Sequence, residues 1–348
     1  MIPLVCPAPI HHRDTILLGH GSGGKLSAEL LREVFLPAFA NPVLARLEDQ
    51  ASLEIGGARL AFTTDSFVVK PLFFRGGDIG SLAVHGTIND LAVGGAIPEF
   101  LSAAFILEEG FPMADLQRIA VSMSLAATKA GVTIVTGDTK VVEHGSGDGV
   151  YINTAGIGRL RDGVRLSASF ARPGDAVILS GSVGDHGIAI LSQREGLELE
   201  SDIASDSAAL HTLVDVMFAA AGANAIRCMR DPTRGGVAST LNEIAEQSAV
   251  GIEIDECAIS IHSAVRGACE LLGLDPLYVA NEGKLIAAVA PECAQALVAA
   301  MRCHPLGADA AVMGRVTAAH PGMVTMRTLF GTSRIVDMLA GDQLPRIC

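Results

Sequence analysis

Short strand-like runs alternate with helix-like runs along almost the whole chain of 348 residues. The first half has runs rich in β-branched and aromatic residues at 15–18, 58–69, 100–107, 132–136 and 149–158. Helical spacing of apolar residues lies between them at 27–36, 78–93 and 113–130. The second half repeats the mixture, with helices near 185–194, 206–221, 234–248, 262–272 and 292–302 and strands near 176–180, 251–254, 284–289, 310–316 and 323–329. Helices and strands mixed at irregular spacing indicate an α+β fold.

The sequence Ala-Arg-Pro-Gly-Asp at 171–175 marks a turn in the middle of the chain, just before the strand expected at 176–180. A chain of this length most naturally forms two domains. We therefore expect an N-terminal segment with a glycine-rich loop at 1–40, one domain at 41–165 and a second at 166–331. Regular patterning fades from Thr332, which predicts a flexible tail over 332–348.

Composition excludes several classes of function. The formal charge of −13 and an aromatic content of 4% argue against a nucleic-acid partner, which requires basic surface and stacking rings. No run of 18 uncharged apolar residues is present, and the first residues lack the features of a signal peptide, so neither a membrane span nor export is expected. Seven cysteines without a Cys-x-x-Cys pair suit reduced thiols in the cytoplasm.

A glycine-rich loop, Gly19-His-Gly-Ser-Gly-Gly-Lys25, lies between an expected strand and an expected helix. It fits the spacing of a phosphate-binding P-loop, but Leu26 occupies the position where Ser or Thr would hold magnesium. Its main-chain N–H groups can still converge on an anion, and Lys25 adds a positive charge. The candidate phosphate contacts are Gly21, Gly23, Gly24 and Lys25. The alternative is a flexible connector.

Acidic residues recur near the ends of the expected strands in the first domain. Asp65 follows one strand, Asp138 follows another, and Asn89-Asp90 lies within a helix. Hard oxygen ligands from separate elements are typical of magnesium–phosphate sites, because Mg²⁺ binds through few carboxylates and completes its shell with substrate oxygens. Each residue alone could equally be a turn or cap residue.

In the second half, Gly181–Gly187 and Arg230–Gly236 each precede an expected helix. Asp185 and Thr233 suffice there as helix N-caps, although the glycines would also permit a close approach to a ligand. The segment Asn281-Glu282-Gly283-Lys284 reads as a tight turn between strands, where most glutamates are solvated.

The last residue, Cys348, places a thiol at the end of the predicted tail. A chain end packs poorly unless it is tied down, so the residue could be accidental. A thiol on a mobile segment can also carry a bonded group between two sites. The tail from Gly331 spans roughly 50 Å when fully extended, which is enough to reach a distant active site.

The segments GHGSGGK, TTDSFVV, GTINDLAVGGA, VTGDTKVV, GDHG, RDPTRGGV, VANEGK and terminal PRIC together resemble the HypE family of hydrogenase maturation proteins, in the PurM-like (aminoimidazole ribonucleotide synthetase) superfamily. The resemblance implies a PurM-like two-domain fold whose N-terminal sheet pairs into a β-barrel in a homodimer. It also implies an ATP-dependent carbamoyl dehydratase. That enzyme receives a carbamoyl group on its terminal cysteine from HypF and converts it to a thiocyanate. The cyanide then goes to iron on the HypC–HypD complex, for NiFe hydrogenase.

The same resemblance implies roles for individual residues. Asp65, Asp90 and Asp138 would bind Mg²⁺ and the phosphates of ATP, with Asn89 nearby, and Lys25 with its loop would close over the triphosphate. Lys140 and Glu282 would polarise the carbamoyl oxygen and remove protons, and Cys348 would carry the group. The alternatives are another ATP-dependent enzyme of this superfamily, such as selenophosphate synthetase or aminoimidazole ribonucleotide synthetase, or a carrier without catalysis.

Overall fold

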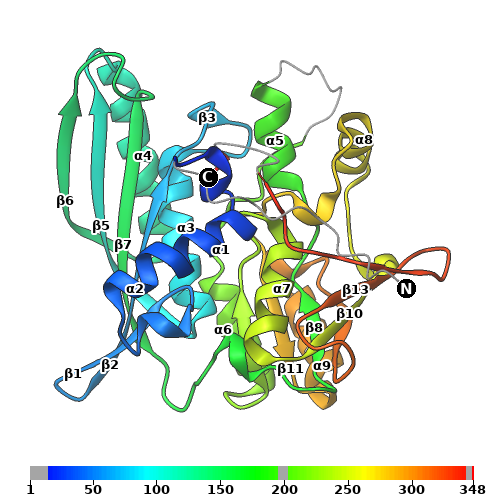
Figure 1. The fold of residues 1–348 in the computed structure, drawn as a ribbon. Coiled ribbons are helices and arrows are strands. Elements are labelled where there is room, and N and C mark those ends of the chain that lie inside the picture. Colours follow the sequence, from blue (N-terminus) through cyan, green and yellow to red (C-terminus); the bar gives the residue numbers. More distant parts are fainter. Residues whose placement is uncertain (1–14, 195–202, 342–346) are drawn as a thin grey trace.

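The computed structural model describes residues 15–194, 203–341 and 347–348, which form two α+β domains side by side (Figure 1). The N-terminal domain contains a five-stranded sheet in the order β1-β2-β7-β5-β6. Its strands are β1 (Ala51–Ile55), β2 (Ala58–Phe67), β5 (Ala96–Glu108), β6 (Thr133–Val142) and β7 (Val150–Leu160). All neighbours are antiparallel except β5 and β6, and a small hairpin of β3 (Phe73–Phe74) and β4 (Gly77–Asp78) follows β2.

Helices α3 (Ile79–Val93) and α4 (Met113–Ala130) connect these strands and pack on one face of the sheet. Strand β7 alternates buried and accessible residues along its length, as expected for a sheet with one covered face. On the other face, Phe62, Ile157 and Phe100 lie in one row across β2, β7 and β5. These side chains are 41%, 42% and 44% exposed. A second apolar surface is needed to cover such a row.

The C-terminal domain contains a seven-stranded sheet in the order β14-β13-β10-β12-β8-β11-β9. Its strands are β8 (Ala176–Leu179), β9 (Ile226–Arg230), β10 (Gly251–Asp255), β11 (Ile286–Val289), β12 (Ala311–Thr317), β13 (Val324–Arg327) and β14 (Ser333–Ile335). Helices α6 (His211–Ala221) and α9 (Ala294–Arg302) cover one face, and α7 (Gly236–Ser248) covers the other. Both faces are therefore buried, which explains why β8 and β11 are buried at every position. Helices α5 (Asp185–Arg194) and α8 (Ser263–Leu272) pack together in a smaller cluster.

Most predicted elements are present, but several boundaries were wrong. The segment 15–18 is not a strand: Leu18–Gly21 forms a 3-10 turn (η1) that pairs with neither sheet. A continuous helical segment follows, formed by α1 (Lys25–Leu30), η2 (Leu31–Phe35) and α2 (Leu36–Phe39). Strands β1 and β9 were not predicted, and β14 lies where patterning was expected to fade. A short strand is defined by its neighbours in the sheet, which local sequence does not reveal.

Within the described residues, none of the helices combines the length and apolar character needed to cross a lipid bilayer. The chain end lies toward the middle of the molecule in the view of Figure 1, near the β3–β4 hairpin, whose Phe74 packs on the histidine that contacts Ile347. The prediction of a flexible tail falls partly on residues 342–346, including Arg346, which lie outside the described part of the chain.

Candidate active site

The last two residues of the chain are held against β2. Ile347 forms an antiparallel bridge with Val69, and the main-chain N–H of Val68 donates to the carbonyl of Cys348 at 3.0 Å. Ile347 is only 6% exposed and belongs to the core of the N-terminal domain. The predicted thiol tail thus enters the body of its own chain.

The thiol of Cys348 lies among ionisable groups from both domains. Burial raises its pKa, the guanidinium of Arg234 opposes this, and the carboxylates of Glu282 and Asp65 add to it. Burial is the largest of these causes. A protonated thiol is a poor nucleophile, so the docked position suits a sulfur that already carries a group.

Four aspartates form a half-buried acidic cluster: Asp49 before β1, Asp65 in β2, Asp90 in α3 and Asp231 after β9. Of these, Asp65 acts directly on the thiol. Burial and then the negative charges of Asp231, Asp49 and Asp65 raise the pKa of Asp90 well above its ordinary range. Burial, followed by Asp49 and Asp65, raises the pKa of Asp231 to about 8. The hydroxyl of Thr63 donates to the Asp90 carboxylate at 2.8 Å. So many carboxylates in one place disfavour their own ionisation, and a divalent cation would relieve this.

Glu282 occupies the turn before β11 and is 2% exposed, so the sequence-based expectation of a solvated glutamate was wrong. Burial raises its pKa well above the ordinary range, and Asp231, Asp65 and Asp206 add to the effect. Its Oε1 atom has no hydrogen-bond partner among the described residues. A buried carboxyl with a free oxygen beside the sulfur is what a proton acceptor for a sulfur-bound group requires.

Two arginines and one aspartate of the Arg230–Gly236 segment were not selected from the sequence. Arg230 is 7% exposed, and its Nη1 atom lies 2.7 Å from Asp49 and 3.1 Å from Glu243. Arg234 donates to the carbonyl of Gly21 at 2.8 Å and interacts with Cys348, Asp65 and Glu282. Had β9 been predicted, Asp231 would have been recognised as a further carboxylate at a strand end.

The glycine-rich loop packs against the start of α7 and against the segment that leads to the chain end. The main-chain N–H of Lys25 donates to the carbonyl of Leu339 at 2.8 Å, and its Nζ atom lies 2.6 Å from Asp337. A Cβ atom on Gly24 would collide with the carbonyl of Leu339, so only glycine permits this approach. Gly23 has a φ of +72°, and a Cβ atom there would lie 2.6 Å from the carbonyl oxygen of Arg234. The loop therefore lies against Arg234 and against the segment that leads to the chain end.

The structure does not bring Asp138 and Lys140 into this site, and the expectation that Asp138 joins Asp65 and Asp90 was wrong for a single chain. Both residues lie within β6, where Lys140 Nζ is 2.8 Å from the Asp138 carboxylate and both side chains are exposed. The strand register aligns Asp138 with Ser66, the neighbour of Asp65, three strands away. Because side chains alternate between faces, Asp138 and Asp65 point to opposite sides of the sheet, at a separation of roughly 14 Å along the row.

Asn89 has a structural role in this arrangement. Its Nδ2 donates to the carbonyls of Ala208 and Glu282, at 3.0 and 3.1 Å, and its Oδ1 accepts from the N–H of Leu210 at 2.8 Å. The amide is fully engaged, so it ties the two domains together behind Glu282 and has no donor left for a cofactor.

A cavity of about 920 Å³ opens next to the acidic cluster. Its polar lining includes Gly23, Gly24, Glu48, Gln50 and Arg230, and its apolar lining comes mainly from α1, the residues that follow it, and β1. The cavity also has charged and polar side chains in its lining, among them Arg32, Glu243 and Glu246, and a pocket that combines apolar surface with polar groups is a typical ligand site. Its size and its position beside the glycine-rich loop fit a nucleotide.

Comparison with known proteins gives the same division of the chain. Residues 47–160 match the N-terminal domain of the AIR synthase related proteins, and residues 172–326 match the C-terminal domain. The carbamoyl dehydratase HypE of Rhizobium leguminosarum bv. viciae is 60% identical over 331 residues, which cover 95% of this chain and 94% of that protein.

Solved structures of HypE proteins are also similar to this chain over most of its length. A HypE–HypF complex has a TM-score of 0.85 at 49% identity and covers 89% of this chain and 99% of its own. A structure of HypE in complex with ATP has a TM-score of 0.81 at 50% identity and covers 96% of this chain and 100% of its own.

Two such domains with an acidic site between them define an AIR synthase related protein. The predicted α+β, PurM-like fold is confirmed by these matches. Within that class, the chain belongs to the HypE family of carbamoyl dehydratases.

Proposed function

We propose that this protein uses ATP to dehydrate an S-carbamoyl group on Cys348 to a thiocyanate, and so supplies cyanide for the iron centre of a NiFe hydrogenase. The observation that carries this proposal is the position of the terminal thiol, which lies beside Glu282, Asp65 and Arg234. Membership of the carbamoyl dehydratase family supports the same reaction.

The reaction needs a better leaving group than the oxygen of a primary amide. Transfer of the γ-phosphoryl group of ATP to the carbamoyl oxygen releases ADP and converts that oxygen into a phosphate ester. Loss of phosphate then breaks the C–O bond, while two protons leave the nitrogen and the C≡N bond forms. The sulfur keeps its bond to carbon throughout. The protein must align the two substrates, balance the phosphate charge and accept protons.

Glu282 is our candidate proton acceptor, because a raised pKa makes its carboxylate a stronger base than an exposed one. Arg234 is the cation next to the sulfur and suits the charge that develops on the transferred phosphoryl group. Because Lys140 lies on β6, it does not reach the carbamoyl oxygen of its own chain. Such a role would require the Lys140 of a second copy of the chain.

ATP binding is supported by the related structure that contains ATP. We propose that the base and ribose occupy the cavity of about 920 Å³ and that Gly21, Gly23, Gly24 and Lys25 cover the phosphates. When ATP binds, the Nζ atom of Lys25 would leave the carboxylate of Asp337 and contact the triphosphate.

We propose that Mg²⁺ binds at the acidic cluster through one or two of Asp65, Asp90 and Asp231, with phosphate oxygens of ATP completing its shell. In the described part of the chain, no three acidic, histidine or cysteine side chains converge closely enough to hold a metal alone. When bound, the ion would neutralise the phosphates, and the pKa values of the cluster would fall.

Several partners complete the proposal. A related HypE forms a complex with HypF, which supports HypF as the source of the carbamoyl group. We further propose the HypC–HypD complex as the acceptor of cyanide, the cytoplasm as the compartment, and a homodimer. The exposed row of Phe62, Phe100 and Ile157 supports pairing of two N-terminal sheets.

The test is mass spectrometry of the C-terminal peptide after carbamoyl loading by HypF, with and without Mg-ATP. We expect the peptide to lose the mass of one water only when Mg-ATP is present, and a chain lacking Cys348 to show neither change. If ATP is consumed while the peptide keeps its carbamoyl mass, the chain is not a dehydratase. If loading occurs without ATP turnover, the chain is a carrier.

A further inference from the structure

The main chain of the last two residues is held from two sides. On one side, the N–H of Val68 donates to the carbonyl of Cys348 at 3.0 Å. On the other, Nε2 of His186 lies 2.5 Å from the carbonyl oxygen of Ile347. His186 is in the first turn of α5, in the C-terminal domain, and has 0% exposure. The tail is therefore clamped between the two domains by contacts to its main chain.

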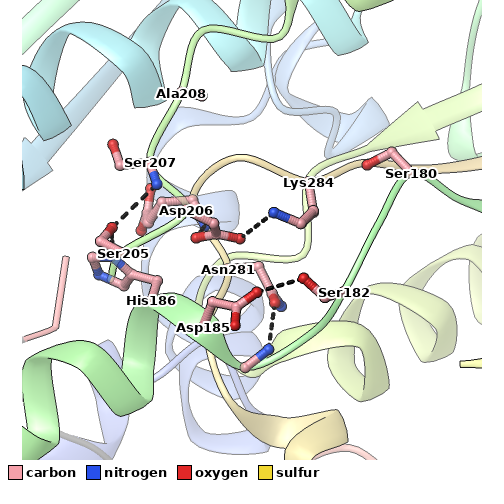
Figure 2. Close-up of polar contacts among 12 residues, drawn as sticks. Ser180, Ser182, Asp185, His186, Ser205, Asp206, Ser207, Ala208, Asn281 and Lys284 are labelled. Carbon is pink, nitrogen blue, oxygen red and sulfur yellow. Dashed lines mark hydrogen bonds and ion pairs between the residues drawn. The ribbon is translucent and has the colours of Figure 1, made fainter. Parts of the chain in front are cut away.

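The neighbours of His186 determine which ring nitrogen carries the proton. The hydroxyl of Ser205 lies 2.8 Å from Nδ1 and also accepts the main-chain N–H of Ser207 at 3.1 Å (Figure 2). The carbonyl oxygen of Ile347 can only accept a hydrogen bond, so Nε2 must carry a proton, and in the neutral ring Nδ1 then accepts the hydroxyl hydrogen of Ser205. Burial lowers the pKa of His186, so the ring is neutral and its proton is on Nε2. In this tautomer, Nε2 donates to the carbonyl of Ile347.

Further contacts fix the position of the ring and of Ser205. Phe74 meets the ring of His186 edge to face, with 5.7 Å between the ring centroids. Asp206, next to Ser205, forms a buried ion pair with Lys284 at 2.9 Å (Figure 2). Asp206 also accepts the main-chain N–H of Glu282 at 3.0 Å. The segment that orients His186 therefore also holds the turn that carries the proposed base.

From this geometry we infer that His186, oriented by Ser205, is the positioning residue that seats the chain end in the active site. The seat contacts the carbonyls of Ile347 and Cys348 and does not bond the sulfur. It can therefore receive the tail whether the sulfur carries hydrogen, a carbamoyl group or a nitrile. The catalytic importance of this seat rests on the proposed function, whereas seating itself is measurable on the unloaded chain.

The experiment compares His186→Phe and His186→Gln with the natural chain. Phe keeps an aromatic ring but removes the donor, and Gln offers an amide donor at a similar reach. The probe is the rate at which iodoacetamide alkylates Cys348 in the full-length chain without ATP, followed by peptide mass spectrometry. Cys257 and Cys303 are exposed in the same chain and serve as internal references.

We expect His186→Phe to raise the alkylation rate of Cys348 relative to the two references by about five- to twentyfold, as the loss of one buried hydrogen bond implies. His186→Gln should restore at least part of the protection. An unchanged ratio in His186→Phe, with a normal thermal melting profile, would overturn the inference. If His186→Phe does not fold, Ser205→Ala is the deciding variant. It removes the hydroxyl that bonds Nδ1 of His186, so it should also raise the alkylation rate of Cys348 relative to the two reference cysteines. An unchanged relative rate in Ser205→Ala would count against the inference.

Loading and dehydration separate this inference from the proposed function. In His186→Phe we expect HypF-dependent carbamoyl loading to stay within about twofold of normal, because loading uses the tail outside its seat, while dehydration slows by about as much as seating is lost. Increased alkylation in the variant, together with no dehydration by the natural chain, would refute the proposed function and leave the seat intact.

Discussion

Replacing Asp231 with Asn tests the electrostatics of the acidic cluster. Burial and the charges of Asp49 and Asp65 raise the pKa of Asp231 from 3.8 to about 8 in the folded protein. A carboxyl with a higher pKa in the folded state binds a proton there that the unfolded chain has already lost, so stability falls as the pH rises between these two values. The ATP-free protein should therefore lose stability from about pH 4 to about pH 8.

The size of the effect follows from the same shift. A rise from 3.8 to about 8 corresponds to an upper bound of roughly 6 kcal/mol in the free energy of unfolding. Neighbouring carboxylates share the proton, so the group titrates jointly and the observable part is smaller. We expect Asp231→Asn to stabilise the ATP-free protein by about 1–3 kcal/mol near pH 8 and to have little effect near pH 4. The same variant should weaken Mg²⁺-dependent ATP binding by at least about tenfold, since it removes a proposed ligand.

The assay is urea unfolding at a series of pH values, together with calorimetric titration of ATP in the presence and absence of Mg²⁺. Asp162→Asn, in the exposed turn after β7, is the matched control and should change neither quantity. A destabilised Asp231→Asn protein at pH 8, or one that binds Mg-ATP normally, would refute the argument that repulsion in this cluster is relieved by a metal.

Three further predictions concern other parts of the site. Glu282→Gln should slow dehydration by about 10²- to 10⁴-fold with loading unchanged, measured on the carbamoylated peptide, and normal dehydration would remove Glu282 as the base. Gly24→Val should collide with the carbonyl of Leu339 and raise the alkylation rate of Cys348, whereas Gly21→Val, with open space around it, is the control. Phe100→Asp should lower the apparent mass in light scattering by about half, because a charge in the paired sheets would be desolvated; an unchanged mass would argue against this sheet face as the dimer interface.

Long, periodic elements were predicted well because their signal is local. Helices α3 and α4 were predicted to within one residue: α3 is an almost continuously buried run that begins after the N-cap Asp78, and α4 is amphipathic and ends at Gly131. Short strands such as β9 were missed. Because β9 was missed, Asp231, which follows it, was not recognised as a candidate site residue. The end of β6 was placed too early, which turned Asp138 from a strand residue into an apparent strand-end ligand.

The amino-acid sequence alone determined the α+β class and the family, because these depend on composition, local periodicity and motifs. Only the tertiary structure decided which side chains share the site. Asp138 and Lys140 have the right chemistry but lie in β6, where the strand register directs them to the opposite face from Asp65. Arg234 and His186 come together with Cys348 across the domain boundary, from positions more than a hundred residues away in the chain. Distances between groups so far apart in sequence arise from the packing of the two domains, and no local pattern records them.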